Sequence, residues 1–237
     1  MKKKSEHFFS AGEKERIRET IQKVEKTTSG EIVLMVVDES APYREAMAIG
    51  AVIISALASL IVVMISSIVI HLATEWSDGS SGIMAFRFLH TIFTMNLWLF
   101  IALALLLYAP ARYLLSLFPK LKAIFITKER MSETVRDRAV TLFYERGLHR
   151  TKHETGVLIL ISILERKVWI LGDRGINEKI SKHFWYDQSV ALSRGIAELR
   201  GGEAACAVIE RCGQELARHF PIGRGDVNEL PDNVISD

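Results

Sequence analysis

Three aspartates stand at positions where a carboxylate could bind a cation or transfer a proton. Asp38 follows one strand-like apolar run, Asp173 lies in Gly172-Asp173-Arg174-Gly175 after another, and Asp187 comes later, beside Trp185-Tyr186. Ligands of open α/β sheets usually bind beyond the carboxyl ends of strands, and Ca²⁺ and Mg²⁺ prefer carboxylate oxygens. We therefore predict that Asp173, Asp38 and Asp187 are metal ligands, provided that the strands bring them together.

A structural role for Asp173 is an open alternative. A short acidic side chain that precedes a helix commonly caps its amino end or forms an Asx turn. His149 and His153 are four residues apart, as helical metal ligands often are, but they follow Gly147, where a helix is expected to end. We interpret these histidines as loop residues. The chain has no HExxH, Walker, GxSxG or GxGxxG motif, so catalytic residues and an organic cofactor are left unassigned.

Short apolar runs and amphipathic segments would position the aspartates. Ser10-Ala11-Gly12-Glu13 forms a capping box, which predicts a helix over residues 11–26. The runs at 31–37, 156–163 and 168–171 are of strand length, and the last two are expected to form an antiparallel hairpin. Further helices are predicted at about 131–147, 179–183, 188–200 and 203–220. The pattern indicates an α/β domain with strands buried on both faces.

Two long stretches, 46–72 and 91–111, contain no Asp, Glu, Lys or Arg. A helix of about 20 residues crosses a hydrocarbon core of about 30 Å, so both stretches are long enough to span a bilayer. We predict a transmembrane helical hairpin at 46–119, inserted into an α/β domain formed by 1–45 and 120–222. Residues 223–237 are expected to be a polar tail.

Basic residues flank the two spans, whereas the connecting segment 73–90 contains only Arg87. The basic residues before the first span include Lys14, Arg16, Arg18, Lys23, Lys26 and Arg44, and those after the second include Arg112, Lys120, Lys122, Lys128 and Arg130. By the positive-inside rule, both termini face the cytoplasm and the loop at 75–79 faces outward. Cys206 and Cys212 would then lie in a reducing compartment and behave as small apolar residues.

The spans themselves indicate anchoring. Ala51, Ser55 and Ser59 recur every four residues, a spacing that lets another helix approach closely. That helix could be the second span or one of another subunit, and ordinary composition explains the series equally well. Neither span carries an Asp, Glu, Lys or Arg that would mark an ion pathway, so transport is not favoured. The net charge of +2 comes from interspersed acidic and basic residues, which argues against nucleic acid as a partner.

Several motifs of the soluble segments resemble the TPM-domain family, which is also called thylakoid-lumen-phosphatase-like. They are Thr27-Thr28-Ser29-Gly30-Glu31-Ile32, Thr155-Gly156-Val157-Leu158-Ile159-Leu160, Glu165-Arg166-Lys167-Val168, Leu171-Gly172-Asp173-Arg174-Gly175-Ile176 and His219-Phe220-Pro221. The tail from Gly225 to Asp232 resembles those of the bacterial membrane-bound branch.

This resemblance implies a small mixed sheet flanked by helices and a place in the bacterial cytoplasmic (inner) membrane. It also implies divalent-cation binding in some members, acid-phosphatase activity proposed for others, and accessory or assembly roles for the rest. Our first hypothesis is a binding or assembly module whose partners are the lipid bilayer and other membrane proteins, or further copies of itself. The alternative is a phosphatase-like hydrolase dependent on Ca²⁺ or Mg²⁺, with Asp173 as the main ligand. A transporter component is a third, weaker hypothesis.

Overall fold

The computed structural model describes residues 4–75, 82–151, 153–223, 230 and 233–236. The chain divides into two compact units. The α/β unit comprises Met1–Pro42 and Lys128–Asp237, and the hairpin unit comprises Tyr43–Thr127. Most of the loop expected to face outward, and all of the tail motif except Leu230, lie outside the described residues.

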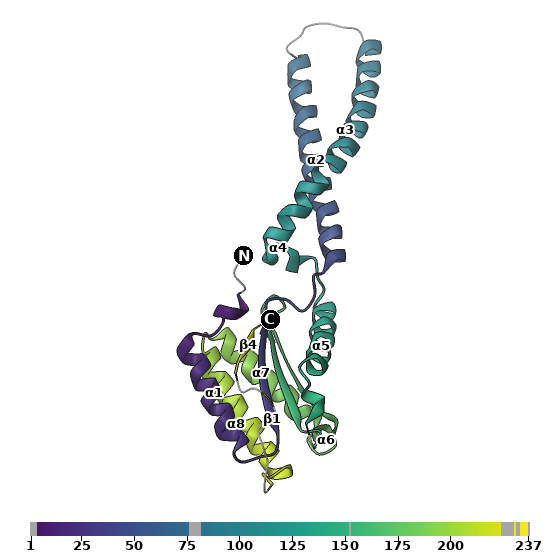
Figure 1. The fold of residues 1–237 in the computed structure, drawn as a ribbon. Helices are drawn as coiled ribbons and strands as arrows, with labels where there is room; N and C mark the ends of the chain where they lie inside the picture. Colours follow the sequence, from purple (N-terminus) through teal and green to yellow (C-terminus); the bar gives the residue numbers. More distant parts are fainter. Residues whose placement is uncertain (1–3, 76–81, 152, 224–229, 231–232, 237) are drawn as a thin grey trace. The chain divides into compact units, whose positions relative to one another are not determined.

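The described part of the α/β unit contains a four-stranded sheet in the order β3-β2-β1-β4 (Figure 1). Strand β1 (Glu31–Val37) pairs in parallel with β2 (Gly156–Ser162), Glu31 lying opposite Gly156. Strand β3 (Lys167–Gly172) runs antiparallel to β2, and β4 (Ile235–Ser236) pairs in parallel with β1. The predicted mixed sheet and its antiparallel hairpin are confirmed, and strands from both sides of the insertion share one sheet.

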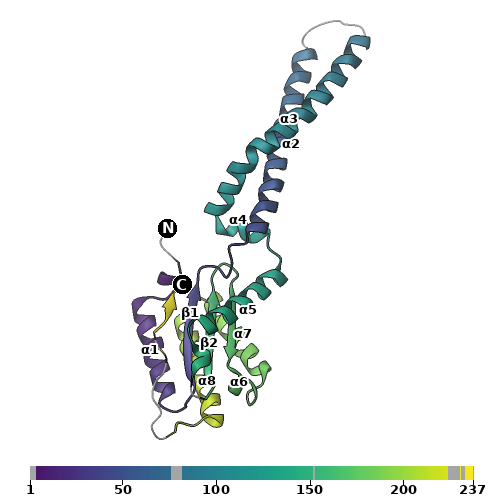
Figure 2. The same ribbon diagram turned by 45° about the vertical axis from the view of Figure 1, so that its right-hand side comes forward.

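Helices cover both faces of this sheet (Figure 2). One core cluster packs Ile32, Leu34 and Val36 with residues of α1 (Ala11–Glu25), α7 (Lys182–Ala197) and α8 (Gly201–His219). The other packs Val33, Met35 and Val37 with α5 (Lys128–Glu145) and the short 3-10 helix η2 (Leu148–Arg150). Alternate residues of β1 therefore enter opposite cores, which explains why the strand is apolar from Ile32 to Val37.

Local signals in the sequence position several helix ends. In the capping box of α1, Ser10 Oγ accepts a hydrogen bond from the Glu13 amide at 3.3 Å, and the Ser10 amide donates to Glu13 Oε2 at 2.8 Å. Helix α5 ends before Gly147, whose φ of 75° suits a glycine at a helix carboxyl end. Another 3-10 helix, η1 (Ser5–His7), precedes α1.

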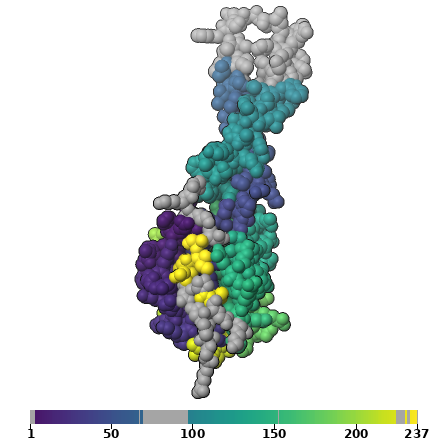
Figure 3. Space-filling model, in the orientation of Figure 1, coloured from purple at the N-terminus to yellow at the C-terminus, as the bar shows by residue number. Residues whose placement is uncertain are grey.

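Two expectations for the second half of the chain were wrong. Helix α7 runs through residues 184–187, where a break was expected, because Trp185 and Gln188 lie on its buried face and Ser181 caps its start. Gly201 and Gly202 form the first turn of α8, although they were expected to lie between two helices. The polar tail contributes β4, and Figure 3 shows these C-terminal residues beside the N-terminal segment, where Ser236 Oγ lies 3.2 Å from the Ser5 carbonyl oxygen.

The hairpin unit consists of α2 (Arg44–Glu75), α3 (Gly82–Leu117) and the short α4 (Pro119–Ile124). Among the described residues, the stretches Arg44–Ser66 and Leu97–Leu117 are long and apolar enough to cross a membrane. Helix α3 continues through Pro110. Membrane helices tolerate proline because neighbouring groups can satisfy the freed carbonyl.

The small-residue series of α2 is buried against α3 of the same chain. Ala51 and Ser59 are fully buried and Ser55 is nearly so, whereas the apolar side chains around them are exposed. Ala51, Ala111 and Leu115 form a small core between α2 and α3, and Leu121 and Phe125 of the α4 region pack against it. Of the two partners considered for the series, the structure selects the second span.

Candidate functional site

Four of the motifs that resemble the TPM family converge at one end of the sheet, which we call the motif edge, whereas Glu165-Arg166-Lys167-Val168 lies at the opposite end. The motif edge comprises residues 28–31, 155–156, 172–175 and 220–221, at the amino ends of β1 and β2. The Thr155 hydroxyl donates to the Ser29 carbonyl at 2.8 Å, and the Thr28 hydroxyl donates to the Phe220 carbonyl at 2.7 Å. These threonines join segments that are more than a hundred residues apart in the sequence, so they act first as structural links.

Asp173 lies at the motif edge and caps α6 (Arg174–Asn177). Its Oδ1 accepts a hydrogen bond from the Arg174 amide at 2.7 Å, and its own amide donates to the Gly156 carbonyl at 2.9 Å. The capping role that the sequence left open is confirmed. The other oxygen, Oδ2, is buried and has no hydrogen-bond partner among the described residues, which leaves this carboxylate with unused bonding capacity.

Two glycines let the backbone close tightly around Asp173. A Cβ atom at Gly156 would lie 2.5 Å from the Leu148 carbonyl oxygen, and one at Gly175 would lie 2.9 Å from the Glu154 carbonyl oxygen. Both neighbours are backbone atoms, which cannot turn aside as a side chain can. These motif glycines are therefore required for the close approach of backbone segments.

Asp38 lies at the opposite end of the sheet from Asp173. It follows β1 and accepts hydrogen bonds from the amides of Ser5 at 2.6 Å and Lys4 at 3.2 Å, so it holds the start of the chain. Strand β3 runs antiparallel to β1 and β2, which places its carboxyl end at their amino ends. Seven residues of β1, at about 3.3 Å each, separate the two ends by about 20 Å.

Asp187 is part of neither end of the sheet. It lies on the exposed side of α7, where its Oδ2 is 3.6 Å from His183 Nε2. The described residues contain no group of three or more histidine, cysteine, aspartate or glutamate side chains that could hold a metal ion. The structure therefore does not bring Asp38, Asp173 and Asp187 together, and these donors do not fit a shared cation site.

The sequence analysis missed a buried polar cluster at the Asp38 end, formed by Ser40, Ser162 and Glu165. Glu165 accepts hydrogen bonds from the Ser162 hydroxyl and, at 3.0 Å, from the Ser40 amide, while the two serine hydroxyls lie 2.9 Å apart. The described contacts place no histidine in the cluster, so a serine activated by a general base is not supported. The signal in the sequence was Ser162, which ends an apolar run three residues before a glutamate.

The arrangement of strands and helices defines the class of protein: an α/β fold with a mixed sheet covered by helices on both faces. Residues 121–215 match the family model described as the TPM domain. The resemblance drawn from the motifs is thereby confirmed.

A solved structure supports the same fold. The chain is similar to the NMR structure of the BA42 protein from the psychrophilic bacterium Bizionia argentinensis, with 20% sequence identity and a TM-score of 0.53. The alignment covers 97% of this chain and 96% of BA42. No curated protein matches the chain.

Proposed function

We propose that this protein is a membrane-anchored binding or assembly module. The hairpin of α2 and α3 crosses the cytoplasmic membrane of a bacterium, both termini lie in the cytoplasm, and the α/β unit engages other membrane proteins or further copies of the chain. The observation that supports the anchoring role is the burial pattern of the hairpin unit, which is the reverse of the pattern in a water-soluble protein. The helices of this unit bury small residues such as Ser55 and Ser59 and expose leucine, isoleucine and valine. A water-soluble hairpin would bury the large apolar residues, whereas lipid can cover them.

The arrangement of the acidic residues favours binding over catalysis. At opposite ends of the sheet, Asp173 caps α6 and Asp38 accepts hydrogen bonds from two backbone amides, and Asp187 pairs with His183 in solvent. Both helices that cover β3 carry an exposed aromatic side chain with a branched one a helical turn away. These pairs are Val140 with Tyr144 on α5 and Tyr186 with Val190 on α7. Exposed tyrosines are common anchors in protein interfaces.

Cysteine labelling in membrane vesicles tests the topology. We would replace Cys206 by Ala and then introduce one new cysteine at a time. Lys14→Cys and Glu178→Cys place it in the two separate segments of the α/β unit, and Ser77→Cys places it in the connecting loop. A membrane-impermeant maleimide should modify positions 14 and 178 only in inverted vesicles and position 77 only in right-side-out vesicles. Labelling of 14 and 178 from opposite sides would refute the proposed anchoring.

Photo-crosslinking tests the binding role. A photoreactive amino acid at Tyr144 or Tyr186, in the full chain and in its native membrane, should give discrete adducts with membrane proteins or with a second copy. The matched control is Glu19, which is exposed on α1 outside these aromatic pairs. Equal adduct patterns at all three positions, or none at any, would contradict a binding surface on α5 and α7.

A cation-dependent phosphohydrolase is the second candidate, and the unpartnered Oδ2 of Asp173 is the observation in its favour. Ca²⁺ takes six to eight oxygen ligands, of which one carboxylate supplies at most two, so this candidate ranks below the binding module. Hydrolysis of a generic phosphate ester by the purified chain, with Mg²⁺ or Ca²⁺ added, tests it. Activity that is abolished by Asp173→Asn and retained by Asp187→Asn would favour the hydrolase, and turnover equal in all three proteins would exclude this role for Asp173.

A further inference from the structure

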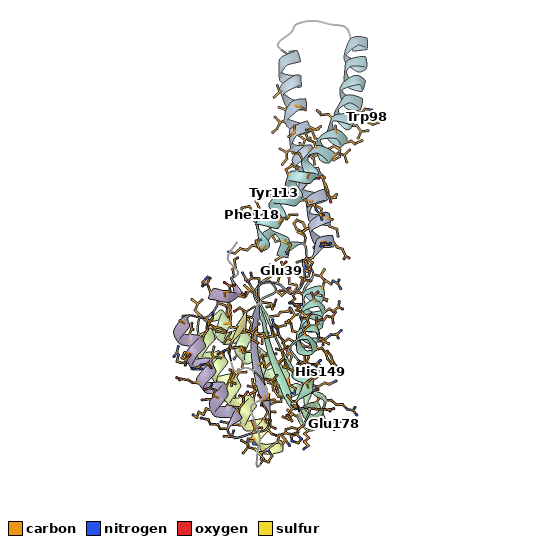
Figure 4. The ribbon with its side chains drawn as sticks, viewed as in Figure 1. Glu39, Trp98, Tyr113, Phe118, His149 and Glu178 are labelled. Carbon is orange, nitrogen blue, oxygen red and sulfur yellow. The ribbon has the colours of Figure 1, made fainter. Side chains whose placement is uncertain are left out.

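The end of α3 and the short helix α4 expose a group of large apolar side chains beside basic ones. We call residues 112–124 the collar. Tyr113, Phe118 and Ile124 are 66%, 52% and 72% exposed, and Leu117 is also exposed. Figure 4 labels Tyr113 in the last turns of α3 and Phe118 directly after its end. Apolar side chains of this size are costly to leave in water, so a partner with an apolar surface is expected here.

Basic groups accompany these side chains. Lys120 is exposed, and so is Arg44 at the start of α2, while Arg112 is half-buried and donates from Nη1 to the Tyr108 hydroxyl at 3.4 Å. Lys122 is buried, with its Nζ 5.7 Å from the centre of the Tyr43 ring, so it is not counted as an available charge. Among the described residues of the hairpin unit, Glu45 is the one acidic residue at this end of the helices.

The collar is held in a defined geometry. Pro119 occupies the first turn of α4, and the Leu121 amide donates to the Phe118 carbonyl at 2.9 Å, so the chain turns sharply where α3 ends. Leu121 and Phe125 pack against the small core of Ala51, Ala111 and Leu115. A Cβ atom at Gly50 would lie 2.7 Å from the Phe125 ring, which shows how closely α2 and the α4 region approach. The exposed groups are therefore presented by a packed support.

We propose that the collar binds anionic phospholipid headgroups at the membrane surface, an inference that rests on the proposed anchoring of the hairpin. The aromatic and aliphatic side chains enter the boundary between headgroups and acyl chains, where tyrosine and phenylalanine are favoured. Lys120, Arg44 and Arg112 contact the phosphate groups. The collar begins within the stretch Leu97–Leu117, which is long enough to span a bilayer, and continues beyond its end, so the surface that meets it at that depth is lipid rather than another soluble protein.

The test uses the full chain reconstituted in vesicles of phosphatidylcholine and phosphatidylglycerol in equal amounts. Electron paramagnetic resonance with spin-labelled forms of each lipid gives their relative association constants with the protein. We expect phosphatidylglycerol to be preferred, and Lys120→Gln or Arg44→Gln to lower that preference by up to about fivefold, because one basic residue near the surface contributes about that factor. Lys23→Gln, which removes a charge from exposed α1, is the matched control and should have no effect.

The outcomes separate this inference from the anchoring proposal. Carbonate extraction of the same vesicles reports whether the hairpin is inserted. Retention of the protein with no preference between the two lipids, or with a preference that Lys120→Gln and Arg44→Gln leave unchanged, overturns the collar site alone. Release of the protein by carbonate overturns both proposals. A protein crosslink that is lost in Lys120→Gln, without any change in lipid preference, would assign the collar to a protein partner and also overturn the inference.

Discussion

The contact between α1 and α8 joins the two separate segments of the α/β unit, and the substitution Gly213→Ala tests it. Gly213 lies on the buried face of α8, directly against Val24 of α1. In an exposed helix interior, replacing glycine by alanine stabilises a protein by about 1 kcal/mol. We expect the opposite sign here, because the added methyl group has no room.

The size of the effect follows from the distances. A Cβ atom at Gly213 would lie 2.2 Å from Cγ1, 2.8 Å from Cγ2 and 3.0 Å from Cβ of Val24. A valine in a helix strongly prefers one rotamer, so rotation of Val24 offers little relief. Overpacking of a core typically costs about 1–3 kcal/mol, and contacts this short belong to the upper half of that range. After the helix-propensity gain is subtracted, we expect a net loss of about 1–2 kcal/mol.

Urea unfolding of the full chain in detergent, followed by tryptophan emission, measures this loss. Gly12→Ala is the matched control, since a Cβ atom at Gly12 meets nothing within 4 Å, and it should be neutral or slightly stabilising. In a Val24→Ala background, which lacks both γ-methyl groups and keeps only the Cβ contact at 3.0 Å, the cost of Gly213→Ala should be much smaller. If Gly213→Ala raises stability in the otherwise unaltered protein, α1 does not pack on α8 as described.

Three further predictions concern the α/β unit. Hydrogen bonds from the backbone and side chain of Ser10 lower the pKa of Glu13, so the stability they contribute is present at neutral pH and disappears as acid takes the pH through the lowered pKa. Ser10→Ala should cost about 1 kcal/mol at pH 7 and less in acid, as urea titrations at several pH values would show. Burial raises the pKa of the Cys212 thiol to about 12, so in a Cys206→Ala protein a colorimetric disulfide reagent at pH 8 should modify it only after unfolding; rapid reaction in that native protein would contradict its buried position. Deleting residues 233–237 removes β4 and the packing of Val234 and Ile235 against the two cores. The deletion should lower the urea midpoint and leave the far-ultraviolet circular dichroism of the helices unchanged, whereas an unaltered midpoint would show that β4 contributes nothing.

Much of the fold could be predicted from local patterns. The runs at 31–37 and 156–163 predicted two buried strands because nearly every position is apolar, and the capping box at Ser10 predicted the start of α1. The uncharged stretches predicted two long apolar helices, although α2 and α3 extend beyond them. These features depend on neighbouring residues, whose spacing determines which face of a helix or strand is apolar.

The candidate metal site depended on the relative direction of the strands, which local patterns do not give. Asp38 and Asp173 each follow a strand, and that pattern suggested one shared site. Strand β3 returns antiparallel to β2, so the ends of β1 and β3 point in opposite directions and the two carboxylates lie far apart. Strand direction results from pairing between distant segments, which a single local pattern does not encode.

The residues alone established which segments are helical, extended or apolar enough for lipid, because hydrogen bonding and burial within a segment follow from its own periodicity. They did not establish how distant segments meet. Three features arise from packing between parts of the chain that the inserted hairpin separates. They are the meeting of distant segments at the motif edge, the pairing of β4 with β1 and the fit of Gly213 against Val24. Such contacts are selected by the free energy of the whole folded unit, so they become visible only when all its segments are in place.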